Sequence, residues 1–472
     1  MRMISILFFS LVLLTPMFGA RPFTYSTESP RISIEVAGME PGWSYLIGTF
    51  ADQQYRVDST LVDNEGRMIF QREEPYPAGL YYIWLPDKLA LQVLVDEDQN
   101  FSLKTQKGDL VAAMKVEGSV DNELLYRNLK YEAQYSASAT SLSARMKELA
   151  PDSPPYQEAK AELDQLIAAR KAHLEELFTQ YPDAFYTQYK KAGQNPDVRE
   201  VFKTDGTLDS AFQLYLYRID FWKDVDFSDE RLLHTPVIAN KLQRYIKTLT
   251  VQHPDSINAA AKFLVDQVLD YPEYYKFFVN WIALQYQPTK SNLMDSEAVF
   301  VFMVENYFTQ ERAFWSDSLQ TWAIRKRASE MAASLVGRQA PDVRSQGPDG
   351  QYYSIYEIKA PYVIVFMYNP TCDHCIEETP KLARFYQEWK DKGVEVFAIA
   401  LDTEDNEWKD FIARNGMNWI NVFDPTNRSI YGKYWVDITP EIYVLNPERK
   451  IIGKNLKVYQ IEEIIRRDQK GR

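Results

Sequence analysis

The two cysteines of the chain are the residues whose type and spacing could carry chemistry. Among 472 residues, Cys372 and Cys375 lie together in one Cys-Asp-His-Cys tetrapeptide. Two thiols at this spacing can alternate between dithiol and disulfide and so exchange disulfides with other molecules. The same spacing forms half of a zinc site, but zinc usually needs four ligands, and the chain has no second CxxC pair and four histidines in all. The tetrapeptide therefore predicts redox chemistry without a metal or other cofactor.

The segments around the cysteines predict the element that positions them. Tyr362 to Tyr368 is a continuous apolar run typical of a buried central strand, and Val394 to Ala400, which is apolar except for Glu395, predicts another. Between them we expect a helix whose apolar face consists of Leu382, Phe385, Tyr386 and Trp389. A CxxC pair inside such a βαβ unit is typical of redox-active proteins.

This placement predicts different roles for the two cysteines. Cys372 would lie at the start of the helix, where unsatisfied N–H groups and the helix dipole stabilise a thiolate, so it is the expected nucleophile. Cys375 lies one turn further along and would attack the mixed disulfide that Cys372 forms. A protonated His374 would stabilise the Cys372 thiolate and Asp373 would oppose it.

The N-terminus has the pattern of an export signal over residues 1–20. Arg2 supplies a positive charge, and the apolar run from Ile4 to Leu14 is too short for a membrane span. Cleavage is expected after Gly19 or Ala20, and an uncleaved segment would anchor the chain to a membrane. Export would place the protein where disulfides persist, and a CxxC pair kept there favours chemistry over structural stapling.

Composition and periodicity predict a folded chain of about three domains. Residues 21–118 show a period of two with turns at 63–66 and 86–87, which predicts an antiparallel β sandwich. Residues 119–335 show a helical period, with Asp255 as the expected cap of an apolar stripe made by Ile257, Ala260, Ala261, Leu264 and Val268. The net charge of −13 argues against a nucleic-acid partner.

Residues 336–472 resemble the TlpA/ResA-type thioredoxin-like proteins of bacterial envelopes. Four separated motifs carry the resemblance in the family's order: Gly337-Arg338-Gln339-Ala340-Pro341-Asp342 with Asp349-Gly350, the strand Val363-Ile364-Val365-Phe366, the CxxC pair, and Thr439-Pro440 before Ile442-Tyr443-Val444-Leu445. The resemblance implies an α/β thioredoxin-like fold and disulfide exchange with cysteine-containing envelope proteins and an upstream redox partner.

The resemblance also implies roles for residues beyond the cysteines. Pro440 matches the family's cis-proline, so Thr439 and Pro440, with His374, are the expected substrate contacts. Glu378 matches an acidic residue that carries protons to or from the thiols, and a buried carboxylate there would have a raised pKa. The tryptophan that usually precedes the first cysteine is absent, and Asn369-Pro370-Thr371 stands there, which leaves the substrate preference open.

The first two thirds of the chain resemble two poorly characterised domains that precede thioredoxin-like domains in many Bacteroidetes proteins. The similarity rests on Asp226-Phe227-Ser228-Asp229, Leu232-Leu233-His234-Thr235-Pro236 and Gln252-His253-Pro254-Asp255-Ser256. It implies an envelope location, names no substrate and leaves the oligomeric state open.

Three alternative functions follow from the same residues. A peroxiredoxin would need proline seven and threonine three residues before its reactive cysteine, and neither cysteine has them. A copper-delivery module of the Sco type would need CxxxC and a distal histidine, and no histidine follows His374. A binding or scaffold protein with a secondary redox pair stays open, because some 300 residues lie outside the thioredoxin-like segment.

Overall fold

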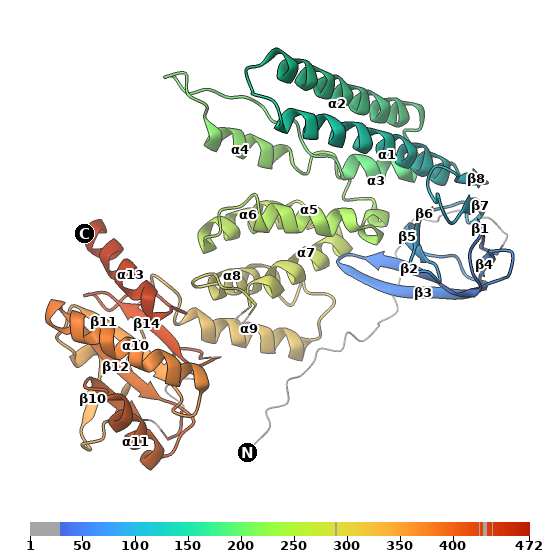
Figure 1. Cartoon of the computed structure of the whole chain (residues 1–472). Helices are drawn as coiled ribbons and strands as arrows, with labels where there is room; N and C mark the ends of the chain where they lie inside the picture. The colour runs from blue at the N-terminus through green and yellow to red at the C-terminus, as the bar shows by residue number, and fades with distance from the viewer. Residues whose placement is uncertain (1–28, 288–289, 424, 428–431, 437) are drawn as a thin grey trace. The chain divides into compact units, whose positions relative to one another are not determined.

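Residues 29–287, 290–423, 425–427, 432–436 and 438–472 are described by the computed structural model (Figure 1). The contacts between residues divide the chain into two compact units. The first unit contains the chain up to Asn195 and Asp224–Ala239, and the second contains Pro196–Lys223 and Asn240–Arg472. The predicted export signal, residues 1–20, lies outside the described residues. Within them, no helix has the length and apolar character that a membrane span requires.

The strands of the first unit form two four-stranded sheets, with orders β4-β1-β7-β8 and β3-β2-β5-β6. Their bounds are β1 Arg31–Ala37, β2 Gly42–Phe50, β3 Gln53–Val62, β4 Arg67–Gln71, β5 Gly79–Trp84, β6 Ala90–Val95, β7 Asn100–Gln106 and β8 Lys115–Glu117. Most pairs are antiparallel, but β1 and β7 are parallel. The expectation of a purely antiparallel domain is wrong for this pair, because a period of two is common to both strand directions.

The predicted turn at residues 63–66 connects β3 to β4. The Asp63 carboxylate accepts hydrogen bonds from the backbone N–H groups of Glu65 and Arg67 at 2.9 and 2.8 Å. Gly66 has a φ of 78°, and a Cβ atom there would lie 2.2 Å from the carbonyl oxygen of Val36. The turn therefore requires glycine at this position.

The helices of the first unit follow directly on its strands. Ser119 caps α1 (Val120–Lys147), which is followed by α2 (Pro154–Gln180), α3 (Phe185–Ala192) and the 3-10 helix η1 (Glu230–His234). The side chain of Asn122 on α1 donates to the carbonyl of Leu94 at 2.7 Å and accepts from its N–H at 2.9 Å. This buried amide pairs both backbone groups of Leu94 on the edge strand β6 and fixes α1 to the sheet.

The second unit begins with a run of helices. They are α4 (Ser210–Asp220), α5 (Pro236–Lys247, which spans the unit boundary), α6 (Pro254–Asp266), α7 (Pro272–Gln285), α8 (Glu297–Tyr307) and α9 (Ser318–Ala332). The expected cap of α6 at Asp255 is wrong: the cap is His253, whose Nδ1 accepts the Asp255 N–H at 3.3 Å. Pro254 occupies the first helical position, where its missing N–H costs nothing, and this moves the helix start one residue ahead of Asp255.

A mixed seven-stranded sheet, ordered β10-β9-β13-β12-β11-β14-β15, ends the second unit. Its strands are β9 Arg344–Gln346, β10 Tyr352–Ser354, β11 Tyr362–Tyr368, β12 Val394–Ala400, β13 Ile420–Phe423, β14 Glu441–Leu445 and β15 Ile451–Gly453. The helices are α10 Asp373–Trp389, α11 Asp405–Asn415 and α13 Val458–Gly471, with the 3-10 turns η2 Ile355–Glu357 and η3 Lys390–Lys392. Both predicted buried strands and the helix between them are confirmed, and the three-part fold class is confirmed with them.

The central strand β11 divides the core of this sheet into two faces. Tyr362, Ile364, Phe366 and Tyr368 pack with α10, α11 and α13, and the intervening side chains pack on the other face. All seven residues of β11 are buried. Each such large apolar side chain stabilises the fold by about 1.5–3 kcal/mol relative to an exposed one. The end of β11 therefore provides a rigid support for the CxxC segment that follows it.

The domain boundaries at 118/119 and 335/336 stay predictions. Strands give way to helices at Ser119, and the last helix before the C-terminal sheet ends at Ala332. The division into two units, however, groups α1 to α3 with the first strands and α6 to α9 with the C-terminal sheet.

Candidate functional site

Cys372 lies at the N-terminus of α10, directly after the loop that leaves β11. It is the N-cap residue of the helix, its N–H donates to the carbonyl of Asn369 at 3.1 Å, and its own carbonyl accepts the N–H of Ile376 at 3.0 Å. The side chain is partly exposed, and both cysteines are free thiols. The predicted position of Cys372 at a helix start is therefore confirmed.

The surroundings of Cys372 favour its thiolate. Burial raises the pKa of this thiol, but the N–H groups of Cys375 and His374 and the side chains of Thr439 and Cys375 lower it, and the result is a pKa below the ordinary value. Backbone N–H groups at a helix start point at the sulfur and stabilise its negative charge. His374 contributes through its backbone, whereas the sequence had suggested its imidazole.

Cys375 has the opposite environment. Its side chain is 0% exposed and belongs to the core beneath α10. Burial raises its pKa to about 12, although the N–H of Asn369, which donates to its sulfur at 3.4 Å, acts in the other direction. The partly exposed Cys372 thiol is thus the more acidic of the two. The buried Cys375 thiol stays protonated at neutral pH.

The peptide bond between Thr439 and Pro440 is cis, as the family resemblance implied. The carbonyl oxygen of Thr439 accepts a hydrogen bond from the Cys372 thiol at 3.3 Å. Two segments 67 residues apart in the sequence therefore meet at the reactive sulfur. Formation of the thiolate removes the S–H donor and leaves this carbonyl free to bind another N–H group.

Asn369-Pro370-Thr371, which replaces the family's tryptophan, forms a turn around the Asn369 side chain. Its Oδ1 accepts from the N–H and the hydroxyl of Thr371 at 2.8 and 2.7 Å, and its Nδ2 donates to the carbonyl of Asp402 at 3.3 Å. An asparagine that bonds its own backbone two residues on stabilises a tight turn without a large side chain. The turn places the backbone N–H of Asn369 where it donates to the Cys375 sulfur.

Glu378 is buried on α10 and caps another helix. Its carboxylate pairs with Lys381 at 2.8 Å and accepts the N–H of Val458, at the start of α13, at 3.4 Å. These contacts give the carboxylate a structural partner on each oxygen. The role in proton transfer that the resemblance implied stays a prediction.

His374 faces a pocket of about 520 Å³ beside α10. The pocket is lined by His374, Glu377, Glu378, Lys381, Lys457, Val458 and Tyr459. The structure therefore brings His374 and Glu378 together at one pocket, while the carbonyl of Thr439, which precedes the cis bond to Pro440, contacts Cys372. Among the described residues, no group of three or more His, Cys, Asp or Glu side chains is placed to hold a metal ion.

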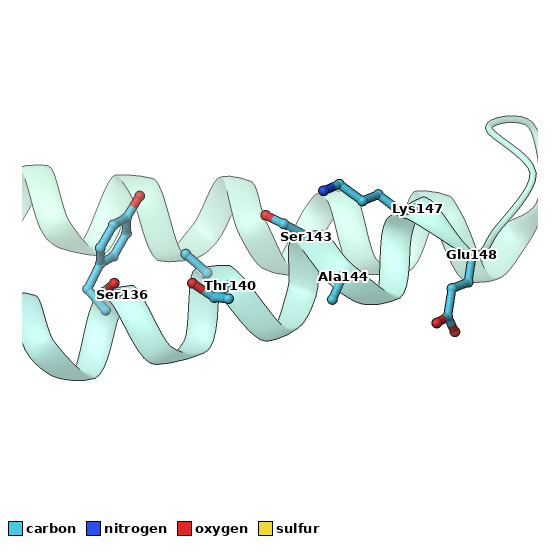
Figure 2. Close-up of a pocket in the computed structure, with 8 residues that line it drawn as sticks. Ser136, Thr140, Ser143, Ala144, Lys147 and Glu148 are labelled. Atoms are coloured by element: carbon cyan, nitrogen blue, oxygen red, sulfur yellow. The ribbon is translucent and has the colours of Figure 1, made fainter.

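A second hollow runs along α1 in the first unit (Figure 2). Its lining residues come from one helix and are Tyr135, Ser136, Ala139, Thr140, Ser143, Ala144, Lys147 and Glu148. Small side chains at helical spacing create this hollow, and it contains no thiol or imidazole. Its chemistry gives no reason to place the reaction there.

Two groups near the redox pair were missed by the sequence analysis. One is the N–H of Asn369, which contacts the Cys375 sulfur, and the other is Tyr368, which belongs to the same core cluster as Cys375. The alternation along β11 could have indicated Tyr368, because every second residue of that strand faces α10. A backbone N–H carries no signal in the sequence.

Two parts of the chain are similar to known protein families. Residues 336–454 match the model of the AhpC/TSA family, and residues 31–125 match a domain of unknown function, DUF4369. The thiol-disulfide oxidoreductase ResA of Bacillus subtilis is 27% identical over 116 residues, which are 25% of this chain and 64% of the relative. The chain thus spans less than two thirds of that protein's length.

Two solved structures of Bacteroides proteins are also similar to parts of this chain. The thioredoxin domain of a Bacteroides vulgatus thiol-disulfide oxidoreductase is 26% identical and has a TM-score of 0.27, covering 28% of this chain and 97% of that one. A thioredoxin-like protein from Bacteroides caccae is 18% identical with a TM-score of 0.46, covering 58% of this chain and 99% of that one.

Proposed function

From the premise that residues 336–454 form a thioredoxin-like domain of the AhpC/TSA family, we propose that the chain exchanges disulfides with protein clients through Cys372 and Cys375. The observation that carries the proposal is the contrast between the two sulfurs. Cys372 is partly exposed, has a lowered pKa and lies against the cis peptide at Pro440, and Cys375 is buried behind it with a raised pKa. Because of this contrast, Cys372 reacts first and Cys375 reacts second.

In the direction that reduces the client, the exchange proceeds in two displacements. The Cys372 thiolate attacks one sulfur of a client disulfide, the client S–S bond breaks, and a mixed disulfide with Cys372 forms. Cys375 then loses its proton and attacks the Cys372 sulfur, which breaks the mixed disulfide and closes the Cys372–Cys375 disulfide. The client gains two electrons and two protons, the chain loses them, and a dithiol reductant restores the pair.

The cis peptide gives the client backbone a place to bind. The carbonyl of Thr439 faces the reactive sulfur, so an extended client segment can donate an N–H to it while its own sulfur approaches Cys372. We expect Thr439 and Pro440 to recognise the backbone, which suits clients of different sequence. His374, next to the nucleophile, would contact client side chains from its pocket.

An insulin-reduction assay tests the proposed activity. The full chain with dithiothreitol as reductant should precipitate insulin chains faster than dithiothreitol alone. A rate equal to the reductant alone would contradict the proposal. Measurement of the reduction potential of the pair then assigns the direction, since a value near that of thioredoxin favours a reductase and a much less negative one favours an oxidant.

Replacing Glu378 by Gln tests the proposed proton transfer. Gln keeps an oxygen for the Val458 N–H but cannot titrate, so the pH profile of thiol alkylation should change its shape between pH 5 and 10. The loss of the ion pair to the half-exposed Lys381 should change the free energy of unfolding by about 0–1 kcal/mol.

Glu377→Gln is the matched control for this substitution. Glu377 is exposed and pairs with the same lysine at 2.8 Å, so this variant removes an equal charge next to the same lysine. Its alkylation profile should follow the wild type. If the Glu378 and Glu377 variants give the same profile as the wild type, Glu378 is a helix cap and carries no proton.

We propose that the protein works in the bacterial envelope, with cysteine-containing envelope proteins as clients and an upstream redox partner. The N-terminal pattern of Arg2 and the apolar run Ile4 to Leu14 supports export, and a cleaved signal would release the chain into the periplasm. Fractionation of cells that express the full chain tests this. Recovery in the cytoplasm with an intact N-terminus would contradict it.

Reduction of peroxide is the alternative that the AhpC/TSA match makes worth testing. The positions seven and three residues before Cys372 are Val365 and Asn369, where a peroxiredoxin needs proline and threonine. Hydrogen peroxide should therefore oxidise the pair no faster than it oxidises an ordinary thiol. Rapid turnover of peroxide with dithiothreitol would favour the peroxidase instead.

A further inference from the structure

The segment Pro196–Lys223 of the second unit carries a surface of exposed large apolar side chains. A hairpin closed by the β-bridge between Phe202 and Leu208 leads into α4, where the rings of Phe212 and Tyr215 stack with a centroid distance of 5.8 Å (Figure 1). Five side chains form this surface, which we call the α4 patch. Each is 44–60% exposed, and they are Phe202, Leu208, Phe212, Tyr215 and Ile219. Exposed apolar residues are common when scattered singly, but a gathering of them in one segment indicates an interaction site.

One side of α4 is already packed against α5. The Arg244 guanidinium of α5 donates to the hydroxyl of Tyr217 at 3.1 Å. Phe221, the C-cap residue of α4, is buried and stacks on Tyr245 of α5 with a centroid distance of 5.9 Å. These contacts fix the helix to the second unit and use the apolar side chains on that side.

The opposite side of α4 should be polar if it met only water. It carries Phe212, Tyr215 and Ile219 instead, at steps of three and four residues that place all three on one face of the helix. The hairpin is fixed to the same helix, because the Gln213 side chain donates to the carbonyl of Arg199 at 2.9 Å. The α4 patch is therefore a preformed surface, and the described part of the chain leaves it open to solvent.

The area of the α4 patch matches what a stable dimer needs. Side chains of this size present roughly 150–250 Å² each, so the five half-exposed residues leave on the order of 500 Å² of apolar surface in water. Two copies that covered each other's patch would bury about 1,000 Å² of apolar surface, which is the size at which specific interfaces begin. The polar rim of the segment would add to this area.

The charge of the segment favours a copy of the same chain over a lipid surface. Between Pro196 and Lys223 there are five acidic and four basic residues, a net charge of −1, while the whole chain carries −13. Two such acidic chains repel one another least where their surfaces are close to neutral. A helix that lies on anionic lipid carries several lysines and arginines on its polar face, whereas Arg218 is the one basic residue within the α4 sequence.

We propose that the α4 patch is the interface of a homodimer, in which a second copy of this chain lays its own α4 patch against it. A two-fold axis makes such an interface self-complementary, because each copy supplies the same row of apolar side chains. Phe212 and Tyr215 lie between Leu208 and Ile219 along this row, and aromatic side chains near the centre of an interface contribute most of its binding energy. The pairing involves no sulfur atom, so it is independent of the proposed disulfide exchange.

Sedimentation equilibrium of the full chain measures this dimer. The Cys372→Ser, Cys375→Ser double variant is the starting protein, because it cannot form disulfides between copies, and we expect it to be dimeric. Adding Tyr215→Glu should raise the dimer dissociation constant by at least about thirtyfold, because the interface would bury an unpaired charge. A rise in NaCl from about 20 to 200 mM should tighten the dimer, because salt screens the repulsion between two acidic chains.

Leu319→Glu is the matched control, because Leu319 is an exposed apolar residue on α9, outside the α4 patch, and its loss should leave the dimer unchanged. Phe212→Leu keeps an apolar side chain in the patch and should also keep the dimer. Both Glu variants should keep the circular dichroism spectrum of the starting protein, since the replaced side chains are exposed. A starting protein that stays monomeric at about 100 μM overturns the inference. A dimer that survives Tyr215→Glu overturns it as well, because the interface then lies elsewhere, and a monomer that cosediments with phosphatidylglycerol-containing vesicles would assign the patch to lipid instead.

Discussion

Replacing Cys372 by Ser should reduce insulin reduction to the level of dithiothreitol alone. The substitution removes the one partly exposed sulfur of the pair, and the remaining sulfur on Cys375 is buried with a pKa of about 12. The thiolate, not the thiol, is the nucleophile in exchange, so a buried protonated thiol cannot take over. The fold should be unaffected, because serine can hold the same N-cap position and is a preferred residue there.

Asp373→Asn is the control that shows whether this loss is specific to the sulfur. Asp373 is the neighbouring residue in the first turn of α10, and its negative charge opposes the Cys372 thiolate. The variant should keep exchange activity and shift Cys372 alkylation to lower pH. If Cys372→Ser retained more than half of the wild-type activity with an intact melting transition, the assignment of the nucleophile would be wrong.

The sequence predicted most of the C-terminal fold, because local pattern and tertiary structure agree there. Tyr362 to Tyr368 is a continuous apolar run and Val394 to Ala400 is apolar except for Glu395, and β11 and β12 have these same bounds. The position of Cys372 at the start of a helix follows from its place after a strand. The cis peptide at Pro440 came from the resemblance to a family and not from the residues themselves.

Other features depend on contacts between distant segments and could not be predicted. The parallel pairing of β1 with β7 joins Arg31–Ala37 to Asn100–Gln106, and the alternation of side chains is the same for either strand direction. The start of α6 could not be predicted to the residue, because several neighbouring side chains are able to cap a helix. Pro254 fits the first helical position, and His253 before it is therefore the cap.

The site shows the same division between local and distant causes. Glu378 could be found as a match to a family position, but its bond to Val458 joins residues 80 apart in sequence, so its capping role was invisible. The pKa difference between Cys372 and Cys375 depends on burial and on the direction of N–H groups, which spacing alone does not give.

Replacing Cys375 by Ser should convert the protein into a trap for its clients. The mixed disulfide on Cys372 persists until a second thiol attacks it, and the chain has no cysteine besides these two. Serine is close in size to cysteine and can accept the Asn369 N–H that now reaches the sulfur, so the buried position should tolerate it. Clients should accumulate as covalent adducts that run at higher mass without reductant and disappear when reductant is added.

The trap is best expressed as the full chain with residues 1–20 intact, so that it meets its clients in the compartment where it works. The Cys372→Ser, Cys375→Ser double variant is the control, because it keeps every surface of the protein and lacks the attacking sulfur. Adducts with the single variant and none with the double one would identify clients by their mass. If the single variant formed no reducible adducts while its Cys372 still alkylated readily, the pair would have no protein clients. A scaffold role for the first two thirds of the chain, or exchange with small thiols, would then explain the protein better, since either function leaves the Cys372 thiolate reactive without a protein disulfide to attack.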